Sequence, residues 1–311
     1  MEREDLHILA RHSTSKEEYI QKILEEDIYN SEREWRKFIK YLLLTFGIGF
    51  STAGTVFFFA YNWNQLHRFA KLGLAEVLII ACMGITIFTK TTSLTRNILL
   101  TACSVLVGVL FAVYGQVYQT GANAYNFFLG WTIFISLWVF ISRFEPLWLI
   151  FITLINTTYF LYTQQVVKEW DSIFIGTTLL LLNSTFLSLS IGLLNNVATW
   201  FTHTLAFACC SIATASIALS IFSDFKYPSL YLVLITGVLY TFGILYGLKN
   251  KSLYYLAMIA LSFTICISCL FLKAKSNDEI SLLLIALFVL LSVSLTVKGL
   301  LSLQKRWKNE N

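Results

Sequence analysis

The stretch NILLTACSVLVGVLFAVYGQVY, residues 97–118, decides the fold class. It runs for 22 residues without a charged side chain, and a helix of that length is about 33 Å long at 1.5 Å per residue. The hydrocarbon core of a bilayer is roughly 30 Å thick. The stretch therefore predicts an α-helix that crosses a membrane.

The rest of the chain has the same character. Of its 311 residues, 57% are hydrophobic and 13% are charged, whereas an average soluble domain is about a quarter charged and just under half apolar. Only 2 prolines and 15 glycines occur, which leaves little room for long irregular loops. We therefore predict an all-α fold, a polytopic transmembrane helical bundle.

Ten apolar runs are long enough to span the bilayer, and nine spans is the main alternative because two connections are very short. Pro146 follows one of these short connections and suits the first turn of a helix. The expected spans are residues 39–61, 71–89, 97–118, 125–142, 146–163, 172–194, 201–222, 229–248, 252–272 and 280–301.

The chain divides into four expected parts. Residues 1–37 form a charged N-terminal helical arm without the pattern of a cleaved signal peptide, so the first span should act as the uncleaved signal. Residues 38–163 and 164–302 are two membrane regions of five spans each, and residues 303–311 are a basic tail.

The placement of basic residues predicts the orientation. With the N-terminus in the cytosol, the cytosolic segments hold thirteen Lys and Arg residues and the outer loops hold six. Cytosolic loops carry the excess of positive charge in membrane proteins. We therefore expect both termini of this multi-pass membrane protein in the cytosol.

Polar residues from separate stretches collect at the predicted outer face. This outward-facing cluster consists of Asn62, Trp63, Asn64, Arg68, Glu76, Tyr114, Gln116, Tyr118, Gln119 and Asn123. Irregular backbone at membrane depth is tolerated where protein or water satisfies it, so the cluster could bind a ligand or an ion. The alternative is that these groups hydrogen-bond neighbouring loops and cap helix ends.

Glu76 is the clearest acidic residue inside a predicted span, and a carboxylate within the membrane is by default a functional hypothesis. It could bind a proton or a cation. The alternative is an interfacial glutamate that pairs with Arg68 or accepts hydrogen bonds from tyrosine hydroxyls.

Other polar and small residues favour structural roles. Asn156 and Asn183 lie well inside spans and suit hydrogen bonds between helices. His203 has no second metal ligand in view. The small-residue pairs Gly243/Gly247 and Gly49/Ala53 are typical of close helix contacts. The six cysteines all lie in apolar runs and suit packing.

Three motifs carry a resemblance to a known family. They are FFFAYNWNQLHRFAKL (57–72), GQVYQTGANAY (115–125) and FLGW (128–131). Over about residues 15–163 the chain resembles the bacterial membrane proteins grouped as domain of unknown function 2157. That family has no established activity, so the resemblance implies a bacterial inner-membrane protein and no mechanism. Its motif positions include Asn62, Gln116 and Gln119, which belong to the outward-facing cluster.

We expect no enzymatic activity, cofactor, metal site or nucleic-acid partner, because the chain contains no nucleotide-binding, zinc-protease or nucleophile-elbow motif. The expected partners are the lipid bilayer and either another membrane protein or a second copy of the chain. Two functions stay open: binding or transport of a small solute or ion through the outward-facing cluster, or a membrane scaffold or sensor that acts through a partner.

Overall fold

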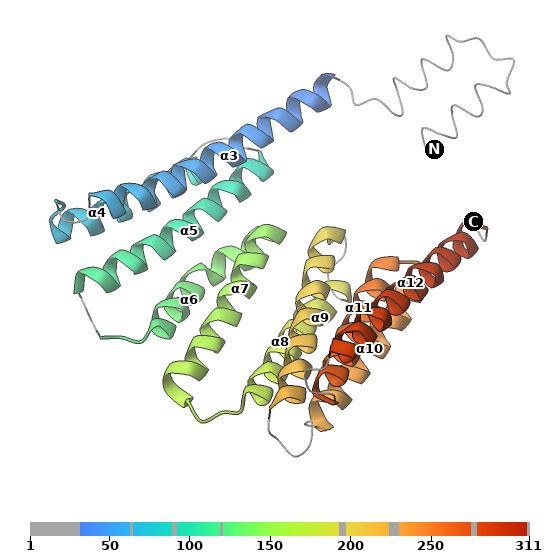
Figure 1. Ribbon diagram of the computed structural model, residues 1–311. Coiled ribbons are helices and arrows are strands. Elements are labelled where there is room, and N and C mark those ends of the chain that lie inside the picture. Colours follow the sequence, from blue (N-terminus) through green and yellow to red (C-terminus); the bar gives the residue numbers. More distant parts are fainter. Residues whose placement is uncertain are drawn as a thin grey trace, which may run out of the picture. The chain divides into compact units, whose positions relative to one another are not determined.

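The computed structural model describes residues 32–62, 65–88, 92–118, 121–192, 197–223, 230–274 and 279–309, and within these ranges every regular element is helical (Figure 1). The predicted arm at residues 1–37 lies outside the described residues as far as Ser31. In chain order the helices are α3 (Glu32–Tyr61), α4 (Arg68–Phe88), α5 (Ser93–Tyr118), α6 (Ala124–Ser142), α7 (Glu145–Tyr162), the π-helical turn η2 (Thr163–Val167), α8 (Ser172–Gly192), α9 (Thr199–Phe222), α10 (Leu230–Lys249), α11 (Leu253–Ala274) and α12 (Glu279–Asn309).

The ten predicted spans are confirmed. The described part of the chain contains ten helices long and apolar enough to cross a membrane. The largest differences are at the two ends, where α3 begins at Glu32 rather than at residue 39 and α12 continues to Asn309 rather than ending at residue 301. Both extensions are rich in Glu, Lys, Arg and Gln, which are good helix formers, so the helix continues past the apolar run.

The chain forms two compact units, an N-terminal unit that ends at Gly121 and a C-terminal unit that begins at Ala122. In the N-terminal unit, α5 packs against both α3 and α4. Phe59 of α3, Ala75 of α4 and Val113 of α5 form its small buried core.

In the C-terminal unit, consecutive helices pack as pairs, α6 with α7, α8 with α9, α10 with α11 and α11 with α12, and α9 also packs against α11 (Figure 1). The core is shared by α8 to α11, through Leu180, Ala213, Leu232 and Ile259. No residue of α12 belongs to this cluster, so α12 is attached mainly through α11.

Two short turns shape the C-terminal unit. Arg143 takes the left-handed conformation (φ 48°) after α6, and Pro146 stands in the first turn of α7, which confirms its predicted role. After α10, Lys251 is left-handed (φ 51°), and the Ser252 N–H donates to the Gly247 carbonyl at 2.8 Å. These two features form a Schellman cap, which satisfies the carbonyls at the end of α10 and turns the chain directly into α11.

Most Ser and Thr hydroxyls in the helices donate to a carbonyl three or four residues earlier, as Thr153 does to Leu149 at 2.8 Å. Ser262 of α11 is an exception, because its hydroxyl lies 2.5 Å from both the Tyr240 hydroxyl of α10 and the Thr214 hydroxyl of α9. Ser262 therefore links three helices in the core of the C-terminal unit.

Asn156 of α7 and Asn183 of α8 were each predicted to form hydrogen bonds between helices, and this is confirmed, because the two residues bond each other. The two amides bond reciprocally, with Nδ2–Oδ1 distances of 3.2 and 2.7 Å. Each Nδ2 also donates at 2.8 Å to the carbonyl four residues earlier, Ile152 or Leu179. All donors of the pair are thus used within the protein.

Small residues allow close approach of helices at three positions in the C-terminal unit. A Cβ added at Gly243 would lie 2.8 Å from Ile259, and one at Gly247 would lie 3.2 Å from Leu256, which confirms the predicted contact there. A Cβ at Gly176 would collide with the Ser216 side chain, 2.9 Å from its Cβ, and the sequence did not indicate this contact. The contact predicted at Gly49 is wrong, because no described atom lies within 4 Å of a Cβ there. The reason is that α3 reaches its unit's core through Phe59.

The predicted orientation can be tested with reporter fusions. We expect green fluorescent protein fused after Asn311 or Asn250 to fluoresce, and alkaline phosphatase fused after Ser223 to be active, because basic residues concentrate at the ends predicted to be cytosolic. Both reporters are placed at all three positions, and expression of each fusion is measured as the control. Active phosphatase after Asn311 would contradict the orientation.

Candidate functional site

The outward-facing cluster is only partly described. Trp63, Asn64 and Gln119 lie outside the described residues, and Asn123 belongs to the C-terminal unit, where it precedes α6. Asn62, next after α3, donates through Nδ2 to the Phe58 carbonyl at 3.0 Å. Its amide donor thus caps its own helix, as the structural alternative expected.

The other described members of the cluster in the N-terminal unit are exposed. Arg68 begins α4, and Glu76 lies on α4 two turns later. These two residues form no ion pair with each other in the described part of the chain. On α5, Gln116 is exposed between Tyr114 and Tyr118, whose ring centroids are 4.8 Å apart. The structure therefore brings together the two tyrosines, and the ligand site predicted for the whole cluster stays a prediction.

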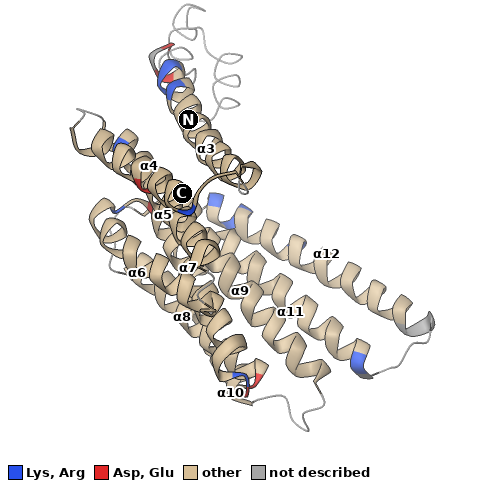
Figure 2. Cartoon of the chain, turned by 90° about the vertical axis from the view of Figure 1, so that its left-hand side faces the viewer, with Lys and Arg blue, Asp and Glu red and all other residues tan. Residues whose placement is uncertain are grey.

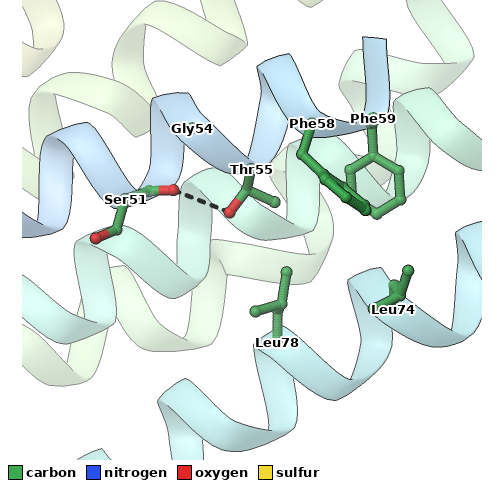
Figure 3. Close-up of a pocket in the computed structure, with 7 residues that line it drawn as sticks. All are labelled: Ser51, Gly54, Thr55, Phe58, Phe59, Leu74 and Leu78. Carbon is green, nitrogen blue, oxygen red and sulfur yellow. Dashed lines mark hydrogen bonds between the residues drawn. The ribbon is translucent and has the colours of Figure 1, made fainter. Parts of the chain in front are cut away.

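A first cavity of about 340 Å³ lies between α3 and α4 of the N-terminal unit (Figure 3). Phe58, Phe59, Leu74 and Leu78 give it mainly apolar walls. Its Thr55 hydroxyl donates to the Ser51 carbonyl at 2.9 Å and is thereby satisfied within α3. The cavity offers little polar recognition, and none of the predicted cluster residues lines it.

A second cavity of about 400 Å³ is lined by α7, α8 and α9 and includes the Asn156–Asn183 pair. Its remaining polar groups are threonine hydroxyls, which donate to carbonyls of their own helices at 2.8 to 2.9 Å. Because the amides bond each other, this cavity also has no donor left for a ligand.

The third cavity differs in its lining, and we call it the His203 cavity. It has a volume of about 330 Å³. Side chains reach it from the C-terminal end of α8, the first turn of α9, the last turn of α10 and the first turn of α11. The lining residues are Ser190, Ile191, Val197, Thr199, Thr202, His203, Tyr246, Asn250, Ser252 and Tyr255.

Aromatic packing holds His203 in place at this cavity. Its ring stacks on Tyr254 with centroids 4.0 Å apart and an interplanar angle of 16°, and it meets Tyr255 edge-on at 5.5 Å. The Tyr254 hydroxyl donates to the His203 carbonyl at 3.1 Å. Tyr246 of α10 packs edge-on against Tyr255 at 5.1 Å. Two ring contacts therefore orient the imidazole, and within the described residues neither uses its nitrogens.

Several polar groups of the His203 cavity keep unused hydrogen-bonding capacity. Within the described residues no hydrogen bond joins the ring nitrogens of His203 or the hydroxyls of Tyr246 and Ser252. Asn250 donates to the Tyr246 carbonyl at 3.1 Å, which leaves its amide oxygen as an acceptor. His203, Tyr246 and Ser252 are half-buried and Asn250 is exposed, so these groups are available to a bound molecule or to water.

One turn and one hydrogen bond position the helix ends that line the cavity, and the sequence predicted neither. The Schellman cap after α10 places Asn250 and Ser252 at the same end of the unit as Thr199 and Thr202 of α9. The Glu145 carboxylate accepts a hydrogen bond from the Ala198 N–H at 3.5 Å and so ties the start of α7 to the start of α9. Of these residues the sequence singled out His203 alone, although Tyr246, Asn250, Ser252 and Tyr255 also fall at span ends on the same predicted membrane face.

No group of three or more His, Cys, Asp or Glu side chains with metal-binding geometry occurs among the described residues. All six cysteines are free thiols.

Comparison with known proteins gives one match. The model of the family described as "Predicted membrane protein (DUF2157)" matches residues 13–148, which include the whole outward-facing cluster. The His203 cavity lies beyond the matched residues. None of the curated proteins and none of the solved structures matches the chain. The chain is a multi-pass membrane protein, and the resemblance to the DUF2157 family suggested by its motifs is confirmed over residues 13–148.

Proposed function

We propose that this protein, in the bacterial inner membrane, binds a small polar solute in the His203 cavity, as the first step of either transport or sensing. The observation that carries the proposal is the convergence of unused donors and acceptors from α9, α10 and the turn between α10 and α11 on one cavity of about 330 Å³. Ligand cavities are typically 300–1,000 Å³ with a few precisely placed polar groups, so the volume favours a small molecule.

The lining suggests the chemistry of the solute. His203, Tyr246 and Ser252 can donate or accept hydrogen bonds, and the Asn250 amide oxygen can accept one. The faces of Tyr255 and Tyr246 provide apolar contact beside these groups. A compact solute with several hydrogen-bonding groups and one apolar side fits this lining, and the proposed role is binding without catalysis.

The outward-facing cluster is the second candidate place for the solute, and the family match over residues 13–148 supports it because all ten cluster residues fall within the match. A binding or transport site there would use Glu76 and the amides of Asn62, Gln116 and Gln119.

A thermal-shift screen tests the proposal. The purified protein is heated with amino acids, sugars, nucleosides and metal ions, and a ligand at about a hundred times its dissociation constant adds about 2.7 kcal/mol to the free energy of unfolding. We expect at least one solute to raise the melting temperature. The shift should disappear in Tyr246→Phe, which removes only a hydroxyl, and in His203→Ala.

The controls are His67→Ala, which removes a histidine at an exposed loop of the other unit, and Glu76→Gln. Both should keep the shift. A shift lost only in Glu76→Gln would place the solute at the outward-facing cluster instead, and no shift with any compound would contradict solute binding.

A membrane scaffold or sensor that acts through a partner is the alternative function. It is favoured by α3 and α12, whose most apolar segments are 6% and 0% buried within the protein. Measurement of the mass of the protein in native nanodiscs distinguishes the two, because a scaffold retains a second membrane protein or a second copy.

A further inference from the structure

The C-terminal helix α12 extends beyond what a bilayer requires. It has 31 residues, which gives a length of about 46 Å at 1.5 Å per residue, against roughly 30 Å for the hydrocarbon core. Its last turns carry Lys305, Arg306 and Lys308, with Lys298 two turns earlier (Figure 2). The basic end of α12 therefore lies where lipid headgroups are expected.

One side of α12 faces α11. The Ser292 hydroxyl lies 2.7 Å from the Thr264 hydroxyl of α11. With about 100° per residue, Thr296, Leu303 and Trp307 point within about 60° of Ser292, and all three are half-buried. This direction is the packed side of the helix.

The lysines lie on the opposite side. By the same rotation, Lys298, Lys305 and Lys308 point about 120–160° away from Ser292, and all three are exposed. Leu283, Leu287, Leu290 and Leu301 continue this side along the helix and are 50% to 69% exposed. The outer side of α12 thus combines a basic end with a stripe of these exposed leucines, which we call the leucine stripe. The basic end matches the headgroup of a phospholipid, and the leucine stripe matches its acyl chains.

These lysines have no acidic partner within the described residues. An ion pair that the described residues do form, Arg36–Glu32, lies within α3. The acidic residue of α12 is Glu279, at the other end of the helix. A lysine exposed towards lipid is costly unless its ammonium reaches the interface and pairs there. Lys298 lies about 10 Å nearer the bilayer centre than Lys305. A lipid phosphate in contact with its ammonium therefore lowers the free-energy cost of Lys298 more than that of Lys305.

We propose that the outer side of α12 is a binding site for an anionic phospholipid. The ammonium groups of Lys298, Lys305 and Lys308 contact the phosphate and the acidic headgroup, and the acyl chains lie along the leucine stripe. Zwitterionic lipids are disfavoured because the three lysines, which have no carboxylate partner within the described residues, would face their positive headgroup. Each basic residue near the membrane surface contributes about 1 kcal/mol towards anionic lipid.

Native mass spectrometry of the detergent-purified protein tests this site. The protein is titrated with phosphatidylglycerol and with phosphatidylcholine of the same chain length. We expect phosphatidylglycerol to bind more tightly, and Lys298→Gln with Lys305→Gln to weaken its binding about 25-fold, since about 1 kcal/mol is lost per lysine. The conservative pair Lys298→Arg with Lys305→Arg should keep the affinity within a few fold.

The matched control is Lys37→Gln with Lys40→Gln, which removes the same charge from the basic start of α3. It should leave the phosphatidylglycerol affinity nearly unchanged. Equal weakening in both double variants would mean diffuse charge attraction and would overturn the site, as would equal affinity for the two lipids. Full competition by inorganic phosphate would overturn it too, because the ligand would then be a free anion. Thermal melting of each variant shows that it is folded.

Discussion

Replacement of Gly176 by Ala should destabilise the C-terminal unit by about 1–3 kcal/mol, the usual cost of adding atoms to a packed core. The added Cβ would collide with the Ser216 side chain, and α8 and α9 would have to separate. The cost is high because Gly176 and Ser216 lie on α8 and α9, which pack closely against each other and against neighbouring helices. The measurement is thermal or denaturant unfolding of the detergent-purified protein, followed by tryptophan fluorescence.

A second substitution makes this prediction specific. In Gly176→Ala with Ser216→Gly the added Cβ would lie 3.9 Å from the Cα of residue 216, an ordinary contact. Ser216→Gly alone should cost about 0.5–1 kcal/mol. The double variant should then be more stable than Gly176→Ala, although it carries one more change. Gly237→Ala is the control, because no described atom lies within 4 Å of that Cβ. If Gly176→Ala behaves like this control, the two helices are not in close contact.

Replacement of Asn183 by Leu should destabilise the protein by about 1–3 kcal/mol. Asn183 is 2% exposed, and its loss removes both amide bonds to Asn156 and leaves the Asn156 Oδ1 without a donor. Hydrogen bonds between helices in membranes contribute about 0.6 kcal/mol on average and up to about 1.7. The lower part of the range applies if water enters the neighbouring cavity.

The double variant Asn156→Leu with Asn183→Leu separates the pair from its members. It leaves no unpaired amide, so its loss of stability should be smaller than the sum of the two single losses. Thr178→Val on α8 is the control, because within the described residues the half-buried Thr178 hydroxyl bonds the Phe174 carbonyl of its own helix at 3.0 Å and no other helix. Additive losses in the double variant would show that the two amides act independently.

The spans could be predicted because each is decided by about 20 local residues. An apolar run of that length has no other stable environment than lipid or a large core. The same reasoning placed Asn156 and Asn183 inside helices and indicated their role. Their partnership came from the packing of α7 near α8, which links positions 27 residues apart.

The His203 cavity could not be predicted in the same way. His203 is an ordinary residue of a helix start until the Schellman cap after α10 brings Asn250 and Ser252 to its side. A count of polar residues at the span ends of one predicted membrane face would have drawn attention to Tyr246 and Tyr255. Gly176 gave no signal either, because the side chain that requires a glycine there belongs to α9.

The hydrogen bonds that side chains form within their own helix lower the free-energy cost of placing α7 in lipid. The segment Glu145–Val167 has the lowest mean hydropathy of the ten spans, 1.3. Scales of this kind count each Thr and Asn as a group that prefers water. Thr153, Thr157 and Asn156 already donate to carbonyls of their own helix, while the oxygens of Thr158 and Tyr159 stay unpaired among the described residues. Partition of α7 from the translocon into lipid should therefore be easier than its composition implies, because most of its polar groups enter the bilayer with their partners.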